Sequence, residues 1–434
     1  MWKLIYNFLI FPYILIFFLI GSIFVKKIRK GFFGRLASIK KIRTFSSNLD
    51  EKDLVYWFHA SSHGEFEQIK PVLDGIKNAN PRIKVLLSFF SPSGYDNVKD
   101  ELIDCKIYIP FDFYFTTKKV FEIISPKKLI FAGYDIWPNF IWSAYQKKIH
   151  IVIFAATFTF HKKTFSSLVK NFYKSLYTNI SAFYTINDDD SDRIKNLIFK
   201  RTNIIIKTMG NPRFDRVKEK SDALKINKDK DLMKRTKRII LGSIHNSDKD
   251  IIIEPLLKLI LDDDELCCIW ALDEIVEGRM LDIEIFFRKK NISIERLGSK
   301  AINEIKSKVI LIDTIGQLYK SYWYGQIAYI GGGFSPSGVH NVMEPAIAKL
   351  PVLFGPNYTK SQEAKQLVSA GGGFKINNST DFYNEIKSLF SNKEQLAKSS
   401  LSSKSVIDKN LGSSKRVVEG ILNDWSGFIW YLFQ

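Results

Sequence analysis

Cysteine is scarce in this chain of 434 residues, which has only three. Cys267 and Cys268 are adjacent and Cys105 is distant from both, so no CxxC pair or Cys/His cluster offers the spacing of a metal site or of a disulfide framework. The sequence also lacks an internal repeat and any long stretch rich in glycine, serine and proline. We therefore expect a reducing compartment and a chain that is folded almost throughout.

Nucleic-acid motifs are missing too, although the net charge is +19. No helix-turn-helix, zinc finger or aromatic RNA-binding signature accompanies the charge. Many lysines are scattered through polar segments, which is compatible with a surface bias alone. Otherwise the charge calls for an acidic partner: nucleic acid, phospholipid headgroups or a phosphorylated substrate. Because the chain begins with an apolar segment, we favour lipid phosphates and expect no nucleic-acid partner.

The first segment carries no charge from Leu4 to Val25 and is followed by the basic stretch KKIRKGFFGRLASIKKIR. At about 1.5 Å per residue, a helix of this length could cross a hydrocarbon layer roughly 30 Å thick. The uncharged run is longer than that of a usual cleaved signal peptide. Because basic flanks stay in the cytoplasm, we expect a membrane anchor with the rest of the chain in the cytoplasm, against an anionic leaflet. Asn7 and Pro12 leave open a kinked segment that is only half inserted.

Beyond residue 50, short apolar runs alternate with longer amphipathic stretches. The runs predict two series of buried parallel strands, at 54–60, 84–89, 128–133, 150–155 and 182–186, and then at 238–243, 266–272, 308–313, 326–333 and 351–356. Two series indicate the α/β class with two doubly wound domains. We place the anchor and its basic flank at 1–30, the domains at 31–210 and 211–410, and a segment that packs back on the first domain at 411–434. The charged stretch 215–238 is the expected linker.

Loops that follow strands are the most informative, because ligands of open α/β sheets bind beyond the carboxyl ends of the strands. In HASSHGE (59–65), small residues and Gly64 allow a tight turn, and Glu65 opens a helical pattern. Glu65 suits a general base at a cleft. It equally suits an ordinary carboxylate in the first turn of a helix, where the helix dipole favours it.

A second loop lies in YIGGGFSPSGVHNVMEPAIAKLPVLFGP (329–356), which predicts a strand, a glycine-rich loop and a helix that begins near His340. Free N–H groups at the helix start would hold a phosphate, and the glycines would permit its close approach. Glu344 would lie where it can accept hydrogen bonds from ribose hydroxyls. The alternative is a plain glycine-rich turn, since neither GxGxxG nor P-loop spacing is present.

The chain resembles the 3-deoxy-D-manno-octulosonic acid (Kdo) transferases in five blocks: HASSHGEFEQIKP, DIWPN, GNPRFD, LGSIHNSD and GGGFSPSGVHNVMEPAIAKLPVLFGP. The resemblance is collinear from the apolar segment to about residue 375. It implies a GT-B fold, in which two Rossmann-like domains face a central cleft. It also implies inverting transfer of Kdo from CMP-Kdo to the lipid A precursor, lipid IVA, next to inner-membrane lipids. No metal and no other cofactor is expected.

The resemblance also assigns roles to individual residues. It places the general base on Glu65, which would take a proton from a primary hydroxyl of the acceptor. The implied donor-binding residues are Gly242, Ser243, His245, Gly331, Gly332, Gly333, His340, Asn341 and Glu344. The implied acceptor-binding residues are Ser62, His63, Gly64, Asp135, Trp137 and Lys162, and the implied inter-domain residues are Asn211 and Arg213.

Three places depart from the family's pattern. Gly133 and Asp135, in GYDIWPN, stand where the family commonly has glutamates. Leu272 and Asp273 occupy a loop that usually carries a basic residue or a histidine, and Thr159 stands where we expect an arginine. These departures keep two alternatives open. One is a related GT-B transferase or epimerase that uses a UDP-sugar, and the other is a relative that binds lipid or glycan without turnover.

Two charged features need separate interpretations. The acidic runs NDDDSD (187–192) and LDDDEL (261–266) superficially resemble metal-binding pairs, but each adjoins a helical pattern and predicts a helix cap or a solvated turn. The basic flank is expected to approach lipid phosphates, or to serve as a topology signal alone. Its residues are Lys26, Lys27, Arg29, Lys30 and Arg35.

Overall fold

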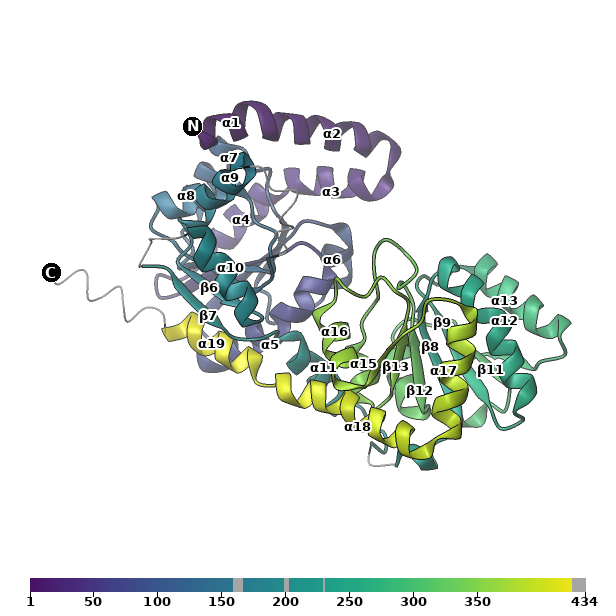
Figure 1. Cartoon of the computed structure of the whole chain (residues 1–434). Coiled ribbons are helices and arrows are strands. Elements are labelled where there is room, and N and C mark those ends of the chain that lie inside the picture. The colour runs from purple at the N-terminus through teal and green to yellow at the C-terminus, as the bar shows by residue number, and fades with distance from the viewer. Residues whose placement is uncertain (159–166, 199–202, 229–230, 424–434) are drawn as a thin grey trace. The chain divides into compact units, whose positions relative to one another are not determined.

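The computed structural model describes residues 1–158, 167–198, 203–228 and 231–423 (Figure 1). These residues form two compact units. Unit 1 comprises residues 1–216 together with the segment that begins at Leu411, and unit 2 comprises Val217–Asn410. Thr159 and Lys162, singled out above, lie outside the described residues.

Unit 1 is built on a parallel sheet of seven strands in the order β3-β2-β1-β4-β5-β6-β7. The five predicted parallel strands are confirmed, and β3 and β7 are additions, because each is an edge strand of four residues that includes a lysine. The strands are β1 Leu54–Ala60, β2 Ile83–Phe89, β3 Cys105–Tyr108, β4 Lys128–Ala132, β5 His150–Ala156, β6 Ala182–Thr185 and β7 Ile205–Thr208.

Both faces of this sheet are covered, which explains why its strands are apolar almost throughout. Alternate residues of β1 point to opposite sides, so that Trp57 joins one core and Phe58 the other. The first core includes residues of α4 (Ser38–Ser47), α7 (Tyr114–Ile123), α8 (Pro138–Gln146), α9 (Ser167–Tyr177) and α10 (Asp188–Ile198). The second is covered by α5 (His63–Ala79) and α19 (Ser413–Asn423), and α19 contributes Val417, Val418 and Ile421.

Unit 2 repeats the architecture with the strand order β10-β11-β9-β8-β12-β13-β14, again all parallel. Its strands are β8 Arg238–Ile244, β9 Cys267–Leu272, β10 Ile294–Arg296, β11 Val309–Ile312, β12 Ile327–Ile330, β13 Val352–Phe354 and β14 Gly373–Lys375. The edge strands β10 and β14 were not predicted, because three residues that include charged ones carry little pattern. Helices α12 (Asn246–Asp262), α13 (Glu277–Lys289), α16 (Gln362–Ala370), α17 (Ser379–Ser391) and α18 (Lys393–Asn410) accompany the sheet. The charged stretch 215–238, expected to be a linker, contains α11 (Arg213–Asp222) and a short 3-10 helix.

Each sheet has a point where the chain order reverses. In unit 1 it lies between β1 and β4, which pair through Phe58 and Ile130. In unit 2 it lies between β8 and β12, which pair through Leu241 and Tyr329. Loops that leave neighbouring strands in opposite directions open a crevice at such a point, and ligands of doubly wound sheets bind there.

The chain begins with a continuous helical segment of three parts: α1 (Trp2–Ile5), a π-helical turn (Tyr6–Ile10) and α2 (Phe11–Phe24). Pro12 explains the π-helical turn, because it has no N–H to donate to the carbonyl of Phe8. Within the described residues, Trp2–Phe24 is the one helix long and apolar enough to cross a membrane, with 23 residues and a mean hydropathy of 2.3. It is followed by α3 (Lys26–Leu36) and α4.

A fully buried carboxylate, Asp112, joins this first segment to α8. Its Oδ2 accepts hydrogen bonds from the Tyr6 hydroxyl at 2.7 Å and from the N–H of Asn139 at 3.1 Å, and its Oδ1 accepts from the N–H of Phe140 at 3.1 Å. Burial raises the pKa of Asp112 from 3.8 to about 7, although the three hydrogen bonds oppose the rise.

The raised pKa of Asp112 predicts how the stability depends on pH. Because the folded chain holds the proton more tightly than the unfolded chain, this contribution is complete below pH 4 and is lost as the pH rises to about 7. The loss is about 4 kcal/mol, since one pKa unit corresponds to about 1.4 kcal/mol. His150 acts in the opposite direction, since burial lowers its pKa to about 4. The measurement is therefore the difference in unfolding free energy between the native chain and Asp112→Asn, by urea titration in detergent. This difference should shrink between pH 4.5 and pH 7.5. If the unfolding free energies of the two chains changed in parallel with pH, the raised pKa of Asp112 would be contradicted.

Candidate functional site

The carboxylate singled out in HASSHGE lies in the first turn of α5, directly after β1. Ser62 is the N-cap of this helix, and its backbone N–H and its hydroxyl both donate to Oε2 of Glu65, the former at 2.8 Å. This is a capping box, and the Ser-x-x-Glu spacing is its sequence signature. Glu65 therefore has the structural role that was the alternative to a general base, that of a carboxylate in the first turn of a helix. The two bonds fall on Oε2, and the half-buried side chain has Oε1 as its second oxygen.

The surroundings of Glu65 are formed by small residues. Gly64 is exposed, and a Cβ added to it would meet only the Ser62 hydroxyl, at 3.5 Å, so packing does not require glycine there. Gly133, in the loop after β4, has φ +79° and would place a Cβ 3.9 Å from Cγ of Glu65. His63 lies 4.0 Å from Glu67 along the helix. The loops after β1 and β4 thus meet at Glu65.

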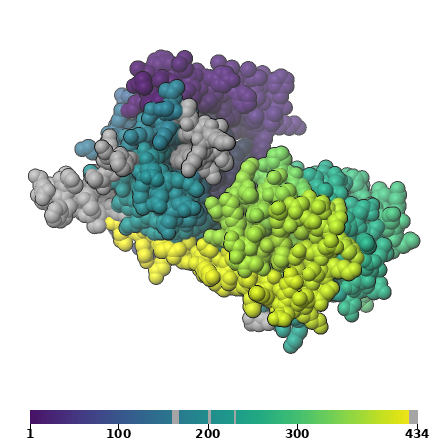
Figure 2. Space-filling model, in the orientation of Figure 1, coloured from purple at the N-terminus to yellow at the C-terminus, as the bar shows by residue number. Residues whose placement is uncertain are grey.

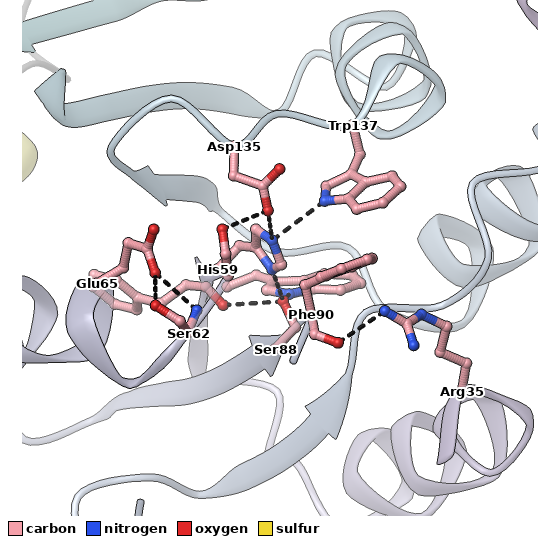
Figure 3. A network of polar contacts seen from close by, with 11 residues as sticks. Arg35, His59, Ser62, Glu65, Ser88, Phe90, Asp135 and Trp137 are labelled. Atoms are coloured by element: carbon pink, nitrogen blue, oxygen red, sulfur yellow. Dashed lines mark hydrogen bonds and ion pairs between the residues drawn. The ribbon is translucent and has the colours of Figure 1, made fainter. Parts of the chain in front are cut away.

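Asp135 lies at the same switch point and is the centre of a polar network (Figure 3). Its Oδ2 accepts from the Ser61 hydroxyl at 2.7 Å and lies 3.4 Å from Nε2 of His59. Nδ1 of His59 is 2.9 Å from the hydroxyl of Ser88, and the indole N–H of Trp137 is 3.3 Å from Nε2 of His59. The network ties β1, β2 and the loop after β4 together.

The electrostatics of Asp135 follow from this network. Its burial acts to raise the pKa, but the hydrogen bonds from His59, Ser61 and Trp137 outweigh that effect, and the pKa lies below its usual value. Asp135 is therefore a carboxylate at neutral pH that can accept hydrogen bonds from a ligand's hydroxyl groups. His59, Ser61 and Ser88 were not predicted as site residues. A histidine within an otherwise apolar strand was the available signal for His59.

Arg35 was expected to approach lipid phosphates, and the structure shows otherwise. Only 8% of Arg35 is exposed, and it donates hydrogen bonds to the carbonyl oxygens of Gly31 and Phe90, the latter at 2.8 Å. Its guanidinium lies 4.5 Å from the centre of the Phe90 ring, which in turn stacks on Trp137. Arg35 thus fixes α3 against the loop after β2, a use of arginine that a count of basic residues does not reveal.

In unit 2, the loops after β8 and β12 are joined by the buried carboxylate of Asp248. Its Oδ2 accepts from the N–H of Gly332 at 2.8 Å and from the N–H of His245 at 3.1 Å, while its Oδ1 accepts from the Tyr329 hydroxyl at 3.0 Å. Asp248 was not predicted as a site residue. It is also the third residue of α12, where it completes a capping box with His245.

Two imidazole rings meet where the loops joined by Asp248 come together. Nε2 of His245 and Nε2 of His340 are 2.6 Å apart, so one of them donates to the other. Nδ1 of His245 lies 3.5 Å from Asp273, which also pairs with Arg279 at 2.7 Å. Burial and the neighbouring His245 lower the pKa of His340. Asp273 therefore orients the histidine pair through His245.

The three consecutive glycines each have a packing reason. A Cβ would lie 2.2 Å from the Ser243 oxygen at Gly331, 2.4 Å from the Gly338 oxygen at Gly332, and 2.4 Å from the Gly355 nitrogen at Gly333. Gly242 is likewise confined, by the hydroxyl of the buried Tyr322. Close approach of the backbone to itself selects glycine here, so these glycines are no independent sign of a ligand.

The helix expected to begin near His340 begins later, so that expectation is wrong. Helix α15 comprises Met343–Ile347, and Oδ1 of Asn341 accepts from the N–H of Met343 at 3.1 Å. Glu344 is the second residue of this helix and not a full turn into it. Pro345 accounts for the late start, since proline is tolerated in the first turn of a helix but not further along. The N–H of His340 instead donates to Gly331 at 3.1 Å.

The expected inter-domain residues lie in a segment that holds α19. Asn211 is buried, and its side-chain oxygen accepts from the N–H of Arg213 at 3.1 Å. In the same segment Asp215 accepts from the N–H groups of Gly412 and Ser414, both at 2.6 Å, which caps the start of α19. The roles of Asn211 and Arg213 between domains stay a prediction.

The acidic runs are structural, as predicted. Helix α10 begins at Asp188, and Oδ1 of Asn187 accepts from the N–H of Asp190 at 2.9 Å, which is a helix cap. Asp263 follows the end of α12 and accepts from the N–H of Glu265 at 3.0 Å in a turn. Among the residues that the structure describes, no group of three or more His, Cys, Asp and Glu side chains could hold a metal ion.

Comparison with known proteins shows what the chain is similar to. A family profile described as 3-deoxy-D-manno-octulosonic-acid transferase (kdotransferase) matches residues 30–216. A relative named 3-deoxy-D-manno-octulosonic acid transferase from Aquifex aeolicus is 27% identical over 345 residues, which cover 78% of this chain and 87% of the relative. One of the same name from Haemophilus influenzae is 24% identical over 368 residues, which cover 84% and 85%. Over most of its length, the chain is similar to Kdo transferases. The names of these relatives support a glycosyltransferase activity, as the resemblance implied.

Solved structures support the fold. The UDP-GlcNAc 2-epimerase of Neisseria meningitidis, bound to UDP-GlcNAc, has 16% sequence identity to this chain and a TM-score of 0.59, covering 86% of this chain and all of the epimerase. A second UDP-N-acetylglucosamine 2-epimerase has 14% identity and the same TM-score, with coverage of 86% and 97%. At these identities the likeness concerns the GT-B-type fold of two parallel sheets with helices.

Proposed function

We propose that this protein is a Kdo transferase that moves Kdo from CMP-Kdo to the lipid A precursor, lipid IVA, at the cytoplasmic face of the inner membrane, with inversion and with Glu65 as general base. One observation carries the proposal. Glu65, Asp135 and Trp137 gather where β1 and β4 meet, and the donor-side loops gather where β8 and β12 meet. Both are the points at which doubly wound sheets bind ligands.

Unit 2 offers the chemistry for the donor. The N–H groups of Gly338 and His340 already donate to Ser335 and Gly331. Within the described chain, those of Val339 and Asn341 have no such backbone partner, and we assign them to the CMP phosphate. Because Nε2 of His340 is engaged with His245, Nδ1 of His340 would supply one further donor to the charge that develops on the departing phosphate.

Unit 1 offers the chemistry for the acceptor. Because Ser62 engages Oε2 of Glu65, we assign Oε1 to the proton of the acceptor's primary hydroxyl. The alkoxide oxygen forms a bond to the anomeric carbon of Kdo as the bond from that carbon to the phosphate oxygen of CMP breaks, and CMP leaves with the electron pair. Asp135 would accept hydrogen bonds from sugar hydroxyls, and the Trp137 ring would stack against the sugar. Gly64 would leave room for the acceptor beside the base.

The test is an assay with purified full-length protein in detergent, CMP-Kdo and tetraacylated lipid A precursor, followed by mass spectrometry of the lipid. A product heavier by one or more Kdo residues is expected, and the mass also reports how many are added. UDP-GlcNAc in place of CMP-Kdo is the parallel arm. Turnover with UDP-GlcNAc but not with CMP-Kdo would show that the donor is a UDP-sugar. Binding of CMP-Kdo without any heavier lipid would show that the protein binds the donor but does not transfer Kdo.

A further inference from the structure

We propose that the apolar helix Trp2–Phe24 does not cross the membrane but lies along its cytoplasmic surface. In this arrangement the helix is one arm of a hairpin, and unit 1 holds both ends of that hairpin. The inference rests on the membrane location proposed above, and it replaces the spanning anchor expected from length and hydropathy alone.

The beginning of the helix is fixed to unit 1 by buried polar contacts. Tyr6 is 4% exposed, and its hydroxyl donates to Asp112 at 2.7 Å. The side-chain amides of Asn7 and Asn139 exchange two hydrogen bonds, at 3.0 and 2.9 Å. Ring contacts surround these bonds, with Phe11 4.7 Å from Phe113 between ring centres. A polar side chain of a membrane-spanning helix would rarely find such hydrogen-bond partners on a domain outside the membrane.

The end of the helix turns back onto the same unit. Val25, with φ −115° and ψ 111°, separates α2 from α3, and Arg29 donates to the carbonyl oxygens of Ser22 at 2.8 Å and Ile23 at 2.5 Å. A Cβ at Gly21 would lie 3.1 Å from a methyl group of Ile28, which reflects the close approach of the two helices. Figure 1 shows α2 and α3 side by side, and α1 contacts α9 of unit 1 through the rings of Trp2 and Phe172.

These contacts cannot coexist with a crossing helix. The distance along a helix from Tyr6 to Val25 is about 28 Å, close to the thickness of the hydrocarbon layer. If the helix crossed, Tyr6 would lie at the far face, while Asp112 stays in unit 1 on the cytoplasmic side. Asp112 would then remain fully buried without its hydroxyl donor, and Asn139 without the amide of Asn7. Burial of unpaired polar groups costs several kcal/mol in total.

The outward face of the hairpin suits a bilayer surface. Leu9, Tyr13, Ile16, Ile20 and Ile23 follow each other at intervals of three and four residues and are all at least half exposed, so they form one stripe. The exposed Phe33 and Leu36 extend it onto α3. Figure 2 shows this first part of the chain, in purple, at the surface of the molecule.

The charge of α3 and α4 indicates that this outward face binds a membrane with anionic headgroups. No acidic residue precedes Asp50, and the exposed basic residues of α3 and α4 are Lys26, Lys27, Arg29, Lys30, Lys40, Lys41 and Arg43. An apolar stripe flanked by cations is the pattern of helices that lie in the membrane interface. Phe18 of α2 contacts Phe90, which stacks on Trp137. The hairpin would thus hold the lipid surface next to the acceptor residues.

The first test is the accessibility of single thiols at the two ends of the helix. Cys105 is half-buried and free and is changed to serine, while Cys267 and Cys268 are buried. Lys3→Cys and Lys27→Cys are then treated with a membrane-impermeant maleimide, in inverted inner-membrane vesicles and in spheroplasts. Both thiols should react in the inverted vesicles and neither in the spheroplasts. Reaction of Lys3→Cys in the spheroplasts alone would overturn the inference.

The second test is a cross-link across the docking contact. In the Cys105→Ser background, the double variant Asn7→Cys/Asn139→Cys should be cross-linked in native membranes by a short reagent that carries two thiol-reactive groups. Each single variant is the control. If both thiols react with a maleimide but no cross-link forms, the docking is wrong. Recovery of the chain in the soluble fraction would overturn the membrane location itself. Kdo transfer is scored separately, so either failure leaves the proposed reaction standing.

Discussion

Replacing Glu65 with glutamine is expected to lower the rate of Kdo transfer by about 10²- to 10⁴-fold, the usual contribution of a general base. Glutamine keeps the length of the side chain and an oxygen that can accept from the N–H of Ser62, and capping boxes use either residue. The helix start should therefore survive, and the change removes the basic oxygen alone. Single-turnover product formation, measured by mass spectrometry, separates this chemical step from product release.

Glu67→Gln is the matched control for this variant. Glu67 lies on the same helix and pairs with Arg216 at 3.3 Å, so its substitution also removes one carboxylate from α5. We expect transfer by Glu67→Gln within tenfold of the native rate and nearly unchanged binding of CMP by both variants. A Glu65→Gln chain that keeps more than a tenth of the native single-turnover rate would show that another group takes the proton.

Much of the sheet architecture could be predicted, because buried parallel strands are long apolar runs. The run 54–60 coincides with β1, and the loops after β1, β8 and β12 are where the site residues were expected. The missed strands β3, β7, β10 and β14 are edges of three or four residues. An edge strand is paired on one side only, so its sequence needs less apolar surface and leaves less pattern.

The residues that shape the site were harder to predict, because their roles depend on contacts between distant segments. Asp112 bonds Tyr6, which is 106 residues away, and Asp248 bonds Gly332, 84 residues away. The same holds for the first helix, whose hydropathy indicates a membrane but whose docking depends on Tyr6 and Asn7. Hydropathy measures how much apolar surface a segment carries, whereas its orientation is decided by a few polar partners.

Replacing Asp248 with asparagine is expected to loosen the donor-side loops of unit 2. All three partners of this carboxylate are donors, namely the N–H groups of His245 and Gly332 and the hydroxyl of Tyr329. An asparagine of the same shape offers one oxygen and turns an NH₂ group toward at least one donor. Loss of hydrogen bonds to a buried charge costs about 2 kcal/mol, and more where a donor stays unpaired.

Hydrogen exchange of the full-length chain measures this effect directly. The amides of His245 and Gly332 should exchange about 30-fold faster in Asp248→Asn, the factor that corresponds to about 2 kcal/mol. Asp250→Asn, an exposed position two residues further along α12, should leave both rates unchanged. Because the same loops are proposed to hold the CMP phosphate, the affinity for CMP should fall with Asp248→Asn. Unchanged exchange at Gly332 would mean that its backbone is held in place by the packing of the glycines alone, without the carboxylate beneath them.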